Sequence, residues 1–171
     1  ILLLDSSTKE KGFKLLMDQY QERLYWHVRR LVIDYDDAND VVQNTFIKVF
    51  RNIHAFEGKS KLYTWLYRIA TNEAISFLSS KQRKQSTSLD EHTMVANTLR
   101  ADTYFDGDAV QIKLKVAIEQ LPEKQKLVFN LRYYDEMPYE KMSAVLETSV
   151  GALKASYHLA AKKVEEYILN H

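Results

Sequence analysis

The stretch PYEKMSAVLETSVGALKASYHLAAKKV, residues 138–164, predicts two short amphipathic helices joined by a tight turn. Apolar residues recur at helical spacing over 139–146, and again in a second stripe after Ser149. That stripe is Leu153, Tyr157, Ala160 and Val164. Ser149 lies directly before the second helix, where its hydroxyl can cap the first backbone N–H groups. Two such helices with a short turn are typical of a helix-turn-helix.

The outward face of the second helix has small, apolar and basic residues and no acid. It consists of Gly151, Ala152, Ala155, His158, Leu159 and Lys162, with Lys154 and Ser156 beside them. This composition suits the major groove of DNA, because a carboxylate there would face phosphate oxygens. A plain helical hairpin with a solvated lysine face is the alternative interpretation.

Upstream of this motif, the pattern predicts two more helices and a boundary. The first helix is expected at roughly 110–120, and the second within LPEKQKLVFNLRYYDEM, residues 121–137, with Pro122 in its first turn. Residues 86–109 are polar and acidic and lack sustained periodicity, so we predict a flexible linker there. The helices downstream of it would form a C-terminal domain over 110–171.

The N-terminal part, residues 1–85, has helical spacing in three segments, 13–33, 38–53 and 62–84. The inward stripe of the middle segment is Val42, Phe46, Val49, Phe50 and Ile53. Asp37 is the expected cap of this middle helix. No segment requires a strand, so the predicted fold is all-α, with two small helical domains.

The composition excludes several classes of site. The 171 residues include 4 Gly and 2 Pro, and Cys is absent. The absence of Cys excludes disulfides, thiolate catalysis and cysteine-ligated zinc. The histidines have no ligand spacing and no nucleophile–base pair stands out, so we expect no metal, no cofactor and no enzyme. The N-terminal apolar run ends at Asp5, too short for a signal peptide or a membrane span. We therefore expect a cytoplasmic protein without membrane insertion.

The charges are segregated along the chain, although the formal net charge is only +1. Residues 59–84 hold six basic residues and one acid, whereas residues 86–111 hold five acids and one basic residue. The basic block follows a loop centred on Gly58 and predicts contact with phosphates. Ordinary solvated side chains are the alternative for Lys61 and Arg68.

Four stretches, taken in order, resemble one family. Region 2 of the extracytoplasmic-function sigma factors, a group of bacterial transcription initiation factors, is similar to D-A-N-D-V-V-Q-N-T-F-I-K-V-F and to F-E-G-K-S-K-L-Y-T-W-L-Y-R-I-A-T-N-E-A. Region 4 of the same group is similar to L-P-E-K-Q-K-L-V-F-N-L-R and to Y-E-K-M-S-A-V-L-E-T-S-V-G-A-L-K-A-S-Y-H. The resemblance covers nearly the whole chain, with a linker where the family has one.

The resemblance implies an alternative sigma factor that recruits core RNA polymerase to promoters. Region 2, over 1–85, would bind the polymerase and recognise and melt the −10 element, and region 4, over 110–171, would bind the −35 element. The implied partners are the β′ clamp helices and the β subunit of core RNA polymerase, promoter DNA and an anti-sigma factor. Two interpretations stay open for the acidic linker, a nucleic-acid mimic in the RNA-exit channel of the polymerase and a solvated spacer.

The resemblance also assigns residues to three surfaces. The polymerase-binding residues would be Asp40, Gln43, Asn44, Ile47 and Lys48. The residues at the −10 element would be Phe56, Lys59, Ser60, Lys61, Tyr63, Thr64, Trp65, Arg68, Asn72 and Arg83. The residues at the −35 element would be Ser149, Gly151, Lys154, Ala155, Ser156, His158, Leu159 and Lys162. Trp65 also lies on an apolar stripe, so packing in the core is an equal alternative to stacking on a base.

The sequence departs from the family pattern in two places. Ser156, Leu159 and Ala161 stand where the family often has Arg, which leaves few guanidinium forks for reading guanine. We therefore do not expect the usual −35 sequence. Glu147 stands at a turn position that often has Gly, and a positive φ there would be strained.

Two other functions fit parts of the sequence less well than a sigma factor does. A stand-alone helix-turn-helix regulator would bind duplex DNA alone, usually as a dimer, but no dimerisation helix is evident in the sequence. A helical interaction protein that never touches DNA would leave both the basic block and the acid-free face unexplained.

Overall fold

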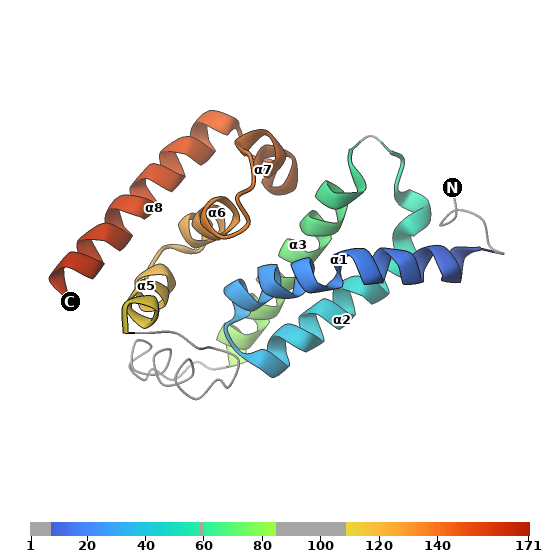
Figure 1. Cartoon of the computed structure of the whole chain (residues 1–171), viewed down its shortest axis with the longest axis horizontal. Helices are drawn as coiled ribbons and strands as arrows, with labels where there is room; N and C mark the ends of the chain where they lie inside the picture. Colours follow the sequence, from blue (N-terminus) through green and yellow to red (C-terminus); the bar gives the residue numbers. More distant parts are fainter. Residues whose placement is uncertain (1–7, 59, 85–108) are drawn as a thin grey trace. The chain divides into compact units, whose positions relative to one another are not determined.

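The structure is a computed structural model that describes residues 8–58, 60–84 and 109–171, without the side chains of residues 82–84. Every regular element in these ranges is a helix, as Figure 1 shows. The chain divides into two compact units, and the division falls after Lys84. The prediction of an all-α fold with two helical domains is confirmed. The expected linker, 86–109, lies outside the described residues except for its last position.

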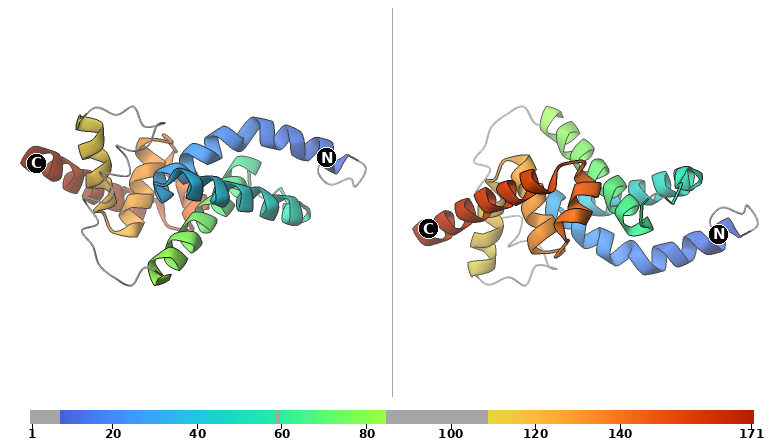
Figure 2. Two further views of the ribbon diagram at one scale, coloured as in Figure 1. Left: turned by 90° about the horizontal axis from the view of Figure 1, so that it is seen from below. Right: turned by 90° about the horizontal axis from the view of Figure 1, so that it is seen from above.

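Unit 1 contains three long helices and one short one. They are α1 (Lys9–Val32), α2 (Tyr35–Asn52), the 3₁₀ helix η1 (Ile53–Ala55) and α3 (Leu62–Lys84). Each long helix packs against the other two (Figures 1 and 2). The fully buried side chains at the centre include Leu24 and Val28 of α1, Val49 of α2 and Leu66 of α3. Burial of these apolar side chains is the main favourable contribution to the fold of this unit.

The start of α2 differs from the expectation from sequence. Its cap is Asp34, and not Asp37, because an Oδ1 atom of Asp34 accepts the backbone N–H groups of Asp36 (3.0 Å) and Asp37 (3.1 Å). The side chain of Asp37 instead forms an ion pair with Lys81 of α3. Ile33, between α1 and α2, has a φ of 71° and a ψ of −51°, and the Asp34 N–H donates to the Val32 carbonyl (2.9 Å). This is a strained γ-turn, which allows a sharp reversal between the two helices.

Unit 2 contains four described helices. They are α5 (Ala109–Glu119), α6 (Glu123–Tyr133), α7 (Tyr139–Leu146) and α8 (Val150–Asn170). The long helix α8 packs against the other three, and Figure 2 shows them along its length. Pro122 and Pro138 immediately precede α6 and α7, as expected for residues that lack an N–H. Ile118, Leu131 and Leu153 are fully buried between these helices.

A buried group of charges connects α5 to α6. The carboxylate of Glu119 lies 3.2 Å from Nζ of Lys115 and 2.6 Å from Nζ of Lys126. The Lys115 and Glu119 side chains are both almost inaccessible to solvent. Since a buried carboxylate requires compensating charges, Lys115 neutralises it from within α5, and Lys126 holds the end of α5 against the first turn of α6.

The turn between α7 and α8 has the features expected from the sequence. Glu147 ends α7 in the left-handed conformation, with a φ of 51° and a ψ of 39°. The Thr148 hydroxyl donates to the Leu146 carbonyl (3.0 Å), and Ser149 caps α8 by accepting the Ala152 N–H (3.3 Å). The predicted cap is confirmed, and Glu147 has the positive φ at which a residue other than glycine is expected to be strained.

The strain at Glu147 can be measured by substitution. Both Glu147→Gly and Glu147→Ala remove the carboxylate, but only glycine adopts the left-handed conformation without steric cost. We expect the glycine variant to have a free energy of unfolding about 1 kcal/mol higher than the alanine variant, in urea unfolding of the full chain. Equal stabilities of the two variants would show that the turn carries no strain.

Candidate protein and nucleic-acid interfaces

The exposed face of α2 carries an unusual mixture of side chains. We call Asp40, Gln43, Asn44, Ile47 and Lys48 the α2 patch. All five residues are exposed, and Ile47 has 42% of its surface accessible. The opposite face of α2 is buried through Val41, Thr45 and Val49. The patch therefore lies on the solvent side of α2 and combines one apolar side chain with two amides, an acid and a lysine.

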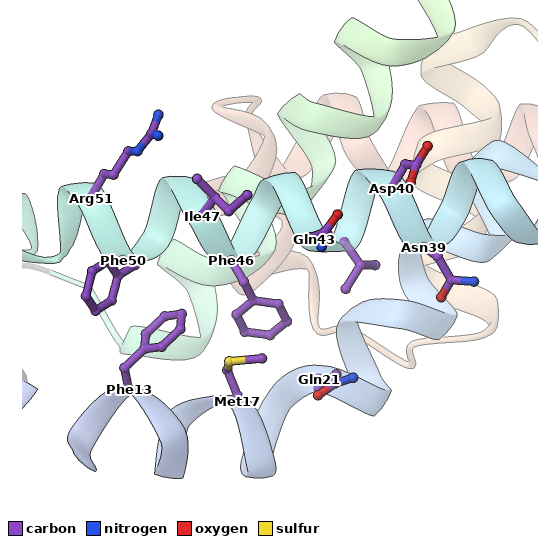
Figure 3. Close-up of a pocket in the computed structure, with 11 residues that line it drawn as sticks. Phe13, Met17, Gln21, Asn39, Asp40, Gln43, Phe46, Ile47, Phe50 and Arg51 are labelled. Atoms are coloured by element: carbon purple, nitrogen blue, oxygen red, sulfur yellow. The ribbon is translucent and has the colours of Figure 1, made fainter. Parts of the chain in front are cut away.

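A groove between α1 and α2 extends this surface. It has a volume of about 830 Å³ and is lined by Phe13, Met17, Gln21, Asn39, Asp40, Val42, Gln43, Phe46, Ile47, Phe50 and Arg51. Figure 3 shows Phe13 and Met17 of α1 pointing towards Phe46 and Phe50 of α2. The Phe13 ring is edge-on to Phe46 (6.1 Å between centroids) and to Phe50 (5.0 Å).

The α1 side of this groove was missed in the sequence. Phe13 and Met17 fall on the helical spacing of apolar residues in the segment 13–33, which does not distinguish a core residue from one that lines a groove. Both are only half-buried, and their accessible parts line the groove. Periodicity identifies the face of a helix that is apolar, but it does not show where a neighbouring helix stops covering that face.

Lys48 has a structural contact as well as a place in the patch. Its ammonium forms an ion pair with Glu73 of α3, and its side chain remains 55% exposed. Asp37 and Lys81 form a second ion pair between the same two helices. Lys48 therefore holds α2 against α3. The other four residues of the α2 patch are better placed to contact a partner protein.

An aromatic pair lies where η1 and the following loop meet α3. The rings of Phe56 and Trp65 are 5.5 Å apart at an interplanar angle of 50°, and both residues are half-buried. Ser60 and Lys61 are exposed beside them in the chain, and Gly58 takes a positive φ of 72° in the loop. Lys59 lies outside the described residues. Trp65 thus packs against the loop and still keeps part of its ring at the surface.

The remaining candidates on α3 fall on different sides of the helix. Arg68 and Asn72 are exposed, and Tyr63 is half-buried with its ring 4.3 Å from that of Tyr67. Thr64 is only 7% exposed, so its side chain faces the interior of unit 1. The side chain of Arg83 is outside the described part of the chain. Among the candidates whose side chains the structure describes, the exposed cations are therefore Lys61 and Arg68.

The core behind this surface contains a buried histidine. His27 of α1 is inaccessible to solvent, and its Nε2 lies 2.9 Å from the Thr71 hydroxyl oxygen of α3. Its ring centroid is 4.9 Å from that of Tyr67. This hydrogen bond satisfies a buried polar group and fixes α3 against α1.

The outward face of α8 is exposed as the sequence predicts. Ser149, Gly151, Lys154, Ala155, His158, Leu159 and Lys162 are exposed, and Ser156 is half-buried. The apolar Leu159 exposes 50% of its surface. A Cβ atom built on Gly151 meets nothing within 4 Å, so space is open at the start of the helix. Leu153, Ala160 and Val164 are buried on the inward side.

The inward side of α8 also contributes to an aromatic stack. The ring of Phe129 on α6 is stacked with Tyr157 (5.7 Å) and with Tyr133 (5.2 Å). Burial raises the pKa of the Tyr157 phenol above 10.0, and the neighbouring phenols of Tyr139 and Tyr133 raise it further, whereas Arg132 lowers it. The stack orients α8 on α6, because offset aromatic pairs prefer defined geometries.

The raised pKa of Tyr157 gives a testable pH dependence. The unfolded chain loses this proton near pH 10, while the folded chain retains it to a higher pH. The contribution to stability is therefore complete below pH 10.0 and is lost as the pH rises through the folded-state pKa. In urea unfolding between about pH 9 and pH 11, we expect stability to fall more steeply for the wild type than for Tyr157→Phe. Parallel curves would contradict this assignment.

Within the described residues, His, Asp and Glu side chains do not gather in any group of three that could hold a metal ion. Nor does any helix of that part combine the length and the apolar character needed to span a bilayer.

Comparisons with known proteins found family models that match both units of the chain. A family model described as Sigma-70 region 2 matches residues 16–84, and one described as Sigma-70, region 4 matches residues 111–164. Two curated relatives are each described as an ECF RNA polymerase sigma-E factor, one from Salmonella typhimurium (strain 14028s / SGSC 2262) and one from Escherichia coli (strain K12). Each is 30% identical over 93% of this chain and 87% of its own length.

Two solved structures share the fold. The sigma factor RpoE from Bartonella quintana, in complex with the anti-sigma factor NepR, aligns with a TM-score of 0.72 at 23% identity. That match covers 92% of this chain and 97% of the RpoE chain. CnrH, in complex with the cytosolic domain of CnrY, aligns with a TM-score of 0.68 at 20% identity, over 94% of this chain and 89% of its own.

Proposed function

This chain belongs to the extracytoplasmic-function group of the sigma-70 family. We propose that it is an alternative sigma factor and that each of its three exposed surfaces binds a different target. A protein of this kind binds core RNA polymerase and directs promoter-specific initiation. In the proposed domain organisation, region 2 spans 1–85, a linker spans 86–109 and region 4 spans 110–171. The function is one of binding, without catalysis, and it is carried out in the cytoplasm.

The α2 patch is the proposed binding site for the β′ clamp helices of core RNA polymerase. The observation that carries this proposal is the exposed Ile47 among Asp40, Gln43 and Asn44, beside an apolar groove. Ile47 offers apolar area to a partner helix, while the acid and the amides offer directional polar contacts. A stand-alone helix-turn-helix regulator would have no use for such a surface.

The loop and α3 are the proposed site for the melted −10 element. Phe56 and Trp65 supply ring faces for an unstacked base, and Lys61 and Arg68 supply positive charge for the backbone. Because these groups favour the single-stranded conformation, binding shifts DNA towards the open state. Thr64 has no direct role in this proposal, since its side chain is buried.

The outward face of α8 is the proposed reader of the −35 element. Lys154 and Lys162 supply positive charge for phosphates, and Leu159 and Ala155 supply apolar contacts suited to thymine methyl groups. His158 and Ser156 can form hydrogen bonds with base edges. Since this face lacks arginine forks, the expected −35 sequence is richer in A·T than in G·C pairs.

An inhibitory partner is part of the proposal. The RpoE structure contains the anti-sigma factor NepR as a bound partner, and the CnrH structure contains the cytosolic domain of CnrY. We expect an anti-sigma factor to compete with polymerase for the α2 patch. The β subunit of the polymerase is the proposed second contact of the bound chain.

Permanganate probing of promoter DNA tests the proposal. Thymines of the −10 element should become reactive only when the purified chain and core RNA polymerase are both present. Phe56→Ala with Trp65→Ala should reduce this reactivity without loss of polymerase binding. The reactivity would be absent with the wild-type chain if it had another function.

A further inference from the structure

Tyr139, the first residue of α7, contacts two cations from two other helices. The Cζ atom of Arg132 on α6 lies 5.2 Å from the centre of the Tyr139 ring, and Nζ of Lys154 on α8 lies 5.8 Å from the same centre. Both distances lie within the range of cation–π interactions. One half-buried ring therefore connects three helices of unit 2.

Arg132 is itself held in place. Its Nη1 atom donates to the Met137 carbonyl (3.3 Å), in the turn that joins α6 to α7. Met137 is fully buried, and its N–H donates to the Leu131 carbonyl (2.9 Å). The guanidinium group is thus fixed to a rigid part of the domain. Its contact with the Tyr139 ring in turn restricts where that ring can lie.

The Tyr139 ring restricts the conformations of the Lys154 side chain. Lys154 is exposed on α8, and a lysine side chain has many rotamers to lose when it binds a phosphate. An aromatic face holds an ammonium group without neutralising it, whereas a carboxylate would compete with the phosphate. Lys162 on the same helix provides the contrast, because its ammonium lies 3.9 Å from the Glu166 carboxylate.

We propose that Tyr139 is a positioning residue that holds the Lys154 ammonium ready for a phosphate of the −35 element. This inference rests on the proposed function of α8. The ring acts through the lysine and does not itself touch DNA. It follows that Tyr139 matters only while Lys154 is present, and that the ring face, not the phenol hydroxyl, is required.

A double-mutant cycle tests the coupling in holoenzyme reconstituted with core RNA polymerase. The DNA is a promoter fragment enriched from a random library by wild-type holoenzyme. We expect Tyr139→Leu to weaken binding roughly 3-fold and Tyr139→Phe to leave it unchanged. In a Lys154→Gln background, Tyr139→Leu should have no further effect. Equal losses in both backgrounds, or equal losses for the leucine and phenylalanine variants, would overturn the proposal.

Two controls separate a positioning effect from loss of structure or of function. In a Lys162→Gln background, Tyr139→Leu should retain its full effect, because Lys162 contacts Glu166 instead of the ring. In the free chain, NMR should show ring-current shifts at the side-chain protons of Lys154, which Tyr139→Leu abolishes and Tyr139→Phe keeps. Unshifted Lys154 protons in the wild type would overturn the proposal, even if no promoter fragment is enriched. Failure of enrichment, with these shifts present, would instead contradict the proposed function.

Discussion

The double variant Asp40→Arg, Gln43→Ala is expected to lose at least about 100-fold in affinity for core RNA polymerase. Both side chains are exposed on the α2 patch and line the groove. Reversing a charge at a complementary interface costs several kcal/mol, and each 1.4 kcal/mol changes affinity about tenfold. The measurement is a titration of fluorescently labelled chain with core polymerase, with circular dichroism to check that the helix content is unchanged.

A matched control lies on the same helix. Asp36 is exposed on the first turn of α2, outside the α2 patch, so Asp36→Arg makes the same change of charge away from the proposed contact. Its affinity for core polymerase should stay close to that of the wild type. The assignment of the patch would be wrong if the double variant bound normally, or if both charge reversals weakened binding equally.

The variant Gly151→Glu is expected to make the protein more stable and inactive at its promoter. Gly151 lies in the first turn of α8, and a Cβ atom there meets no neighbouring atom within 4 Å. Replacing glycine in a helix is favourable, and an acid near a helix N-terminus complements the dipole, which together give a gain of about 1 kcal/mol. On the DNA-facing side, the same carboxylate would meet phosphate oxygens and lower promoter affinity about 100-fold.

Gly151→Gln separates the charge from the bulk of the new side chain. It has nearly the same shape as the glutamate variant and carries no charge, so it should lower promoter affinity much less. Both variants should unfold at a higher urea concentration than the wild type. If Gly151→Glu were fully active on promoter DNA, α8 could not bind the major groove with this face.

Helical periodicity was sufficient to predict most of the fold. Each long helix has an apolar stripe that repeats at helical spacing, and proline or a cap marks several of the starts. The cap of α2 was misassigned because four residues, 34–37, include three aspartates. Any of these aspartates could cap a helix. Asp34 is the cap because Ile33 forms a γ-turn directly before it, and a positive φ is not expected at a β-branched residue such as isoleucine.

The site was only partly predictable for a related reason. The exposed residues of α2 and α8 follow from the opposite, buried stripes, so their faces could be assigned from spacing alone. The α1 side of the groove and the contact of Tyr139 with Arg132 and Lys154 depend on how separate helices meet. Thr64 was predicted to bind DNA from its place in a motif that resembles the family, but neighbouring residues bury its side chain. Contacts between separate helices cannot be predicted from the identity of any single residue.

Run-off transcription with core RNA polymerase tests the central claim most directly. On a library of promoter fragments, the wild-type chain should produce transcripts that begin at defined sites. The Asp40→Arg, Gln43→Ala variant should produce none because it cannot join the polymerase, and Gly151→Glu should join the polymerase but fail to start at −35-dependent promoters. If the wild-type chain and core polymerase gave no promoter-dependent product on any fragment, the account of this chain as a sigma factor would be contradicted.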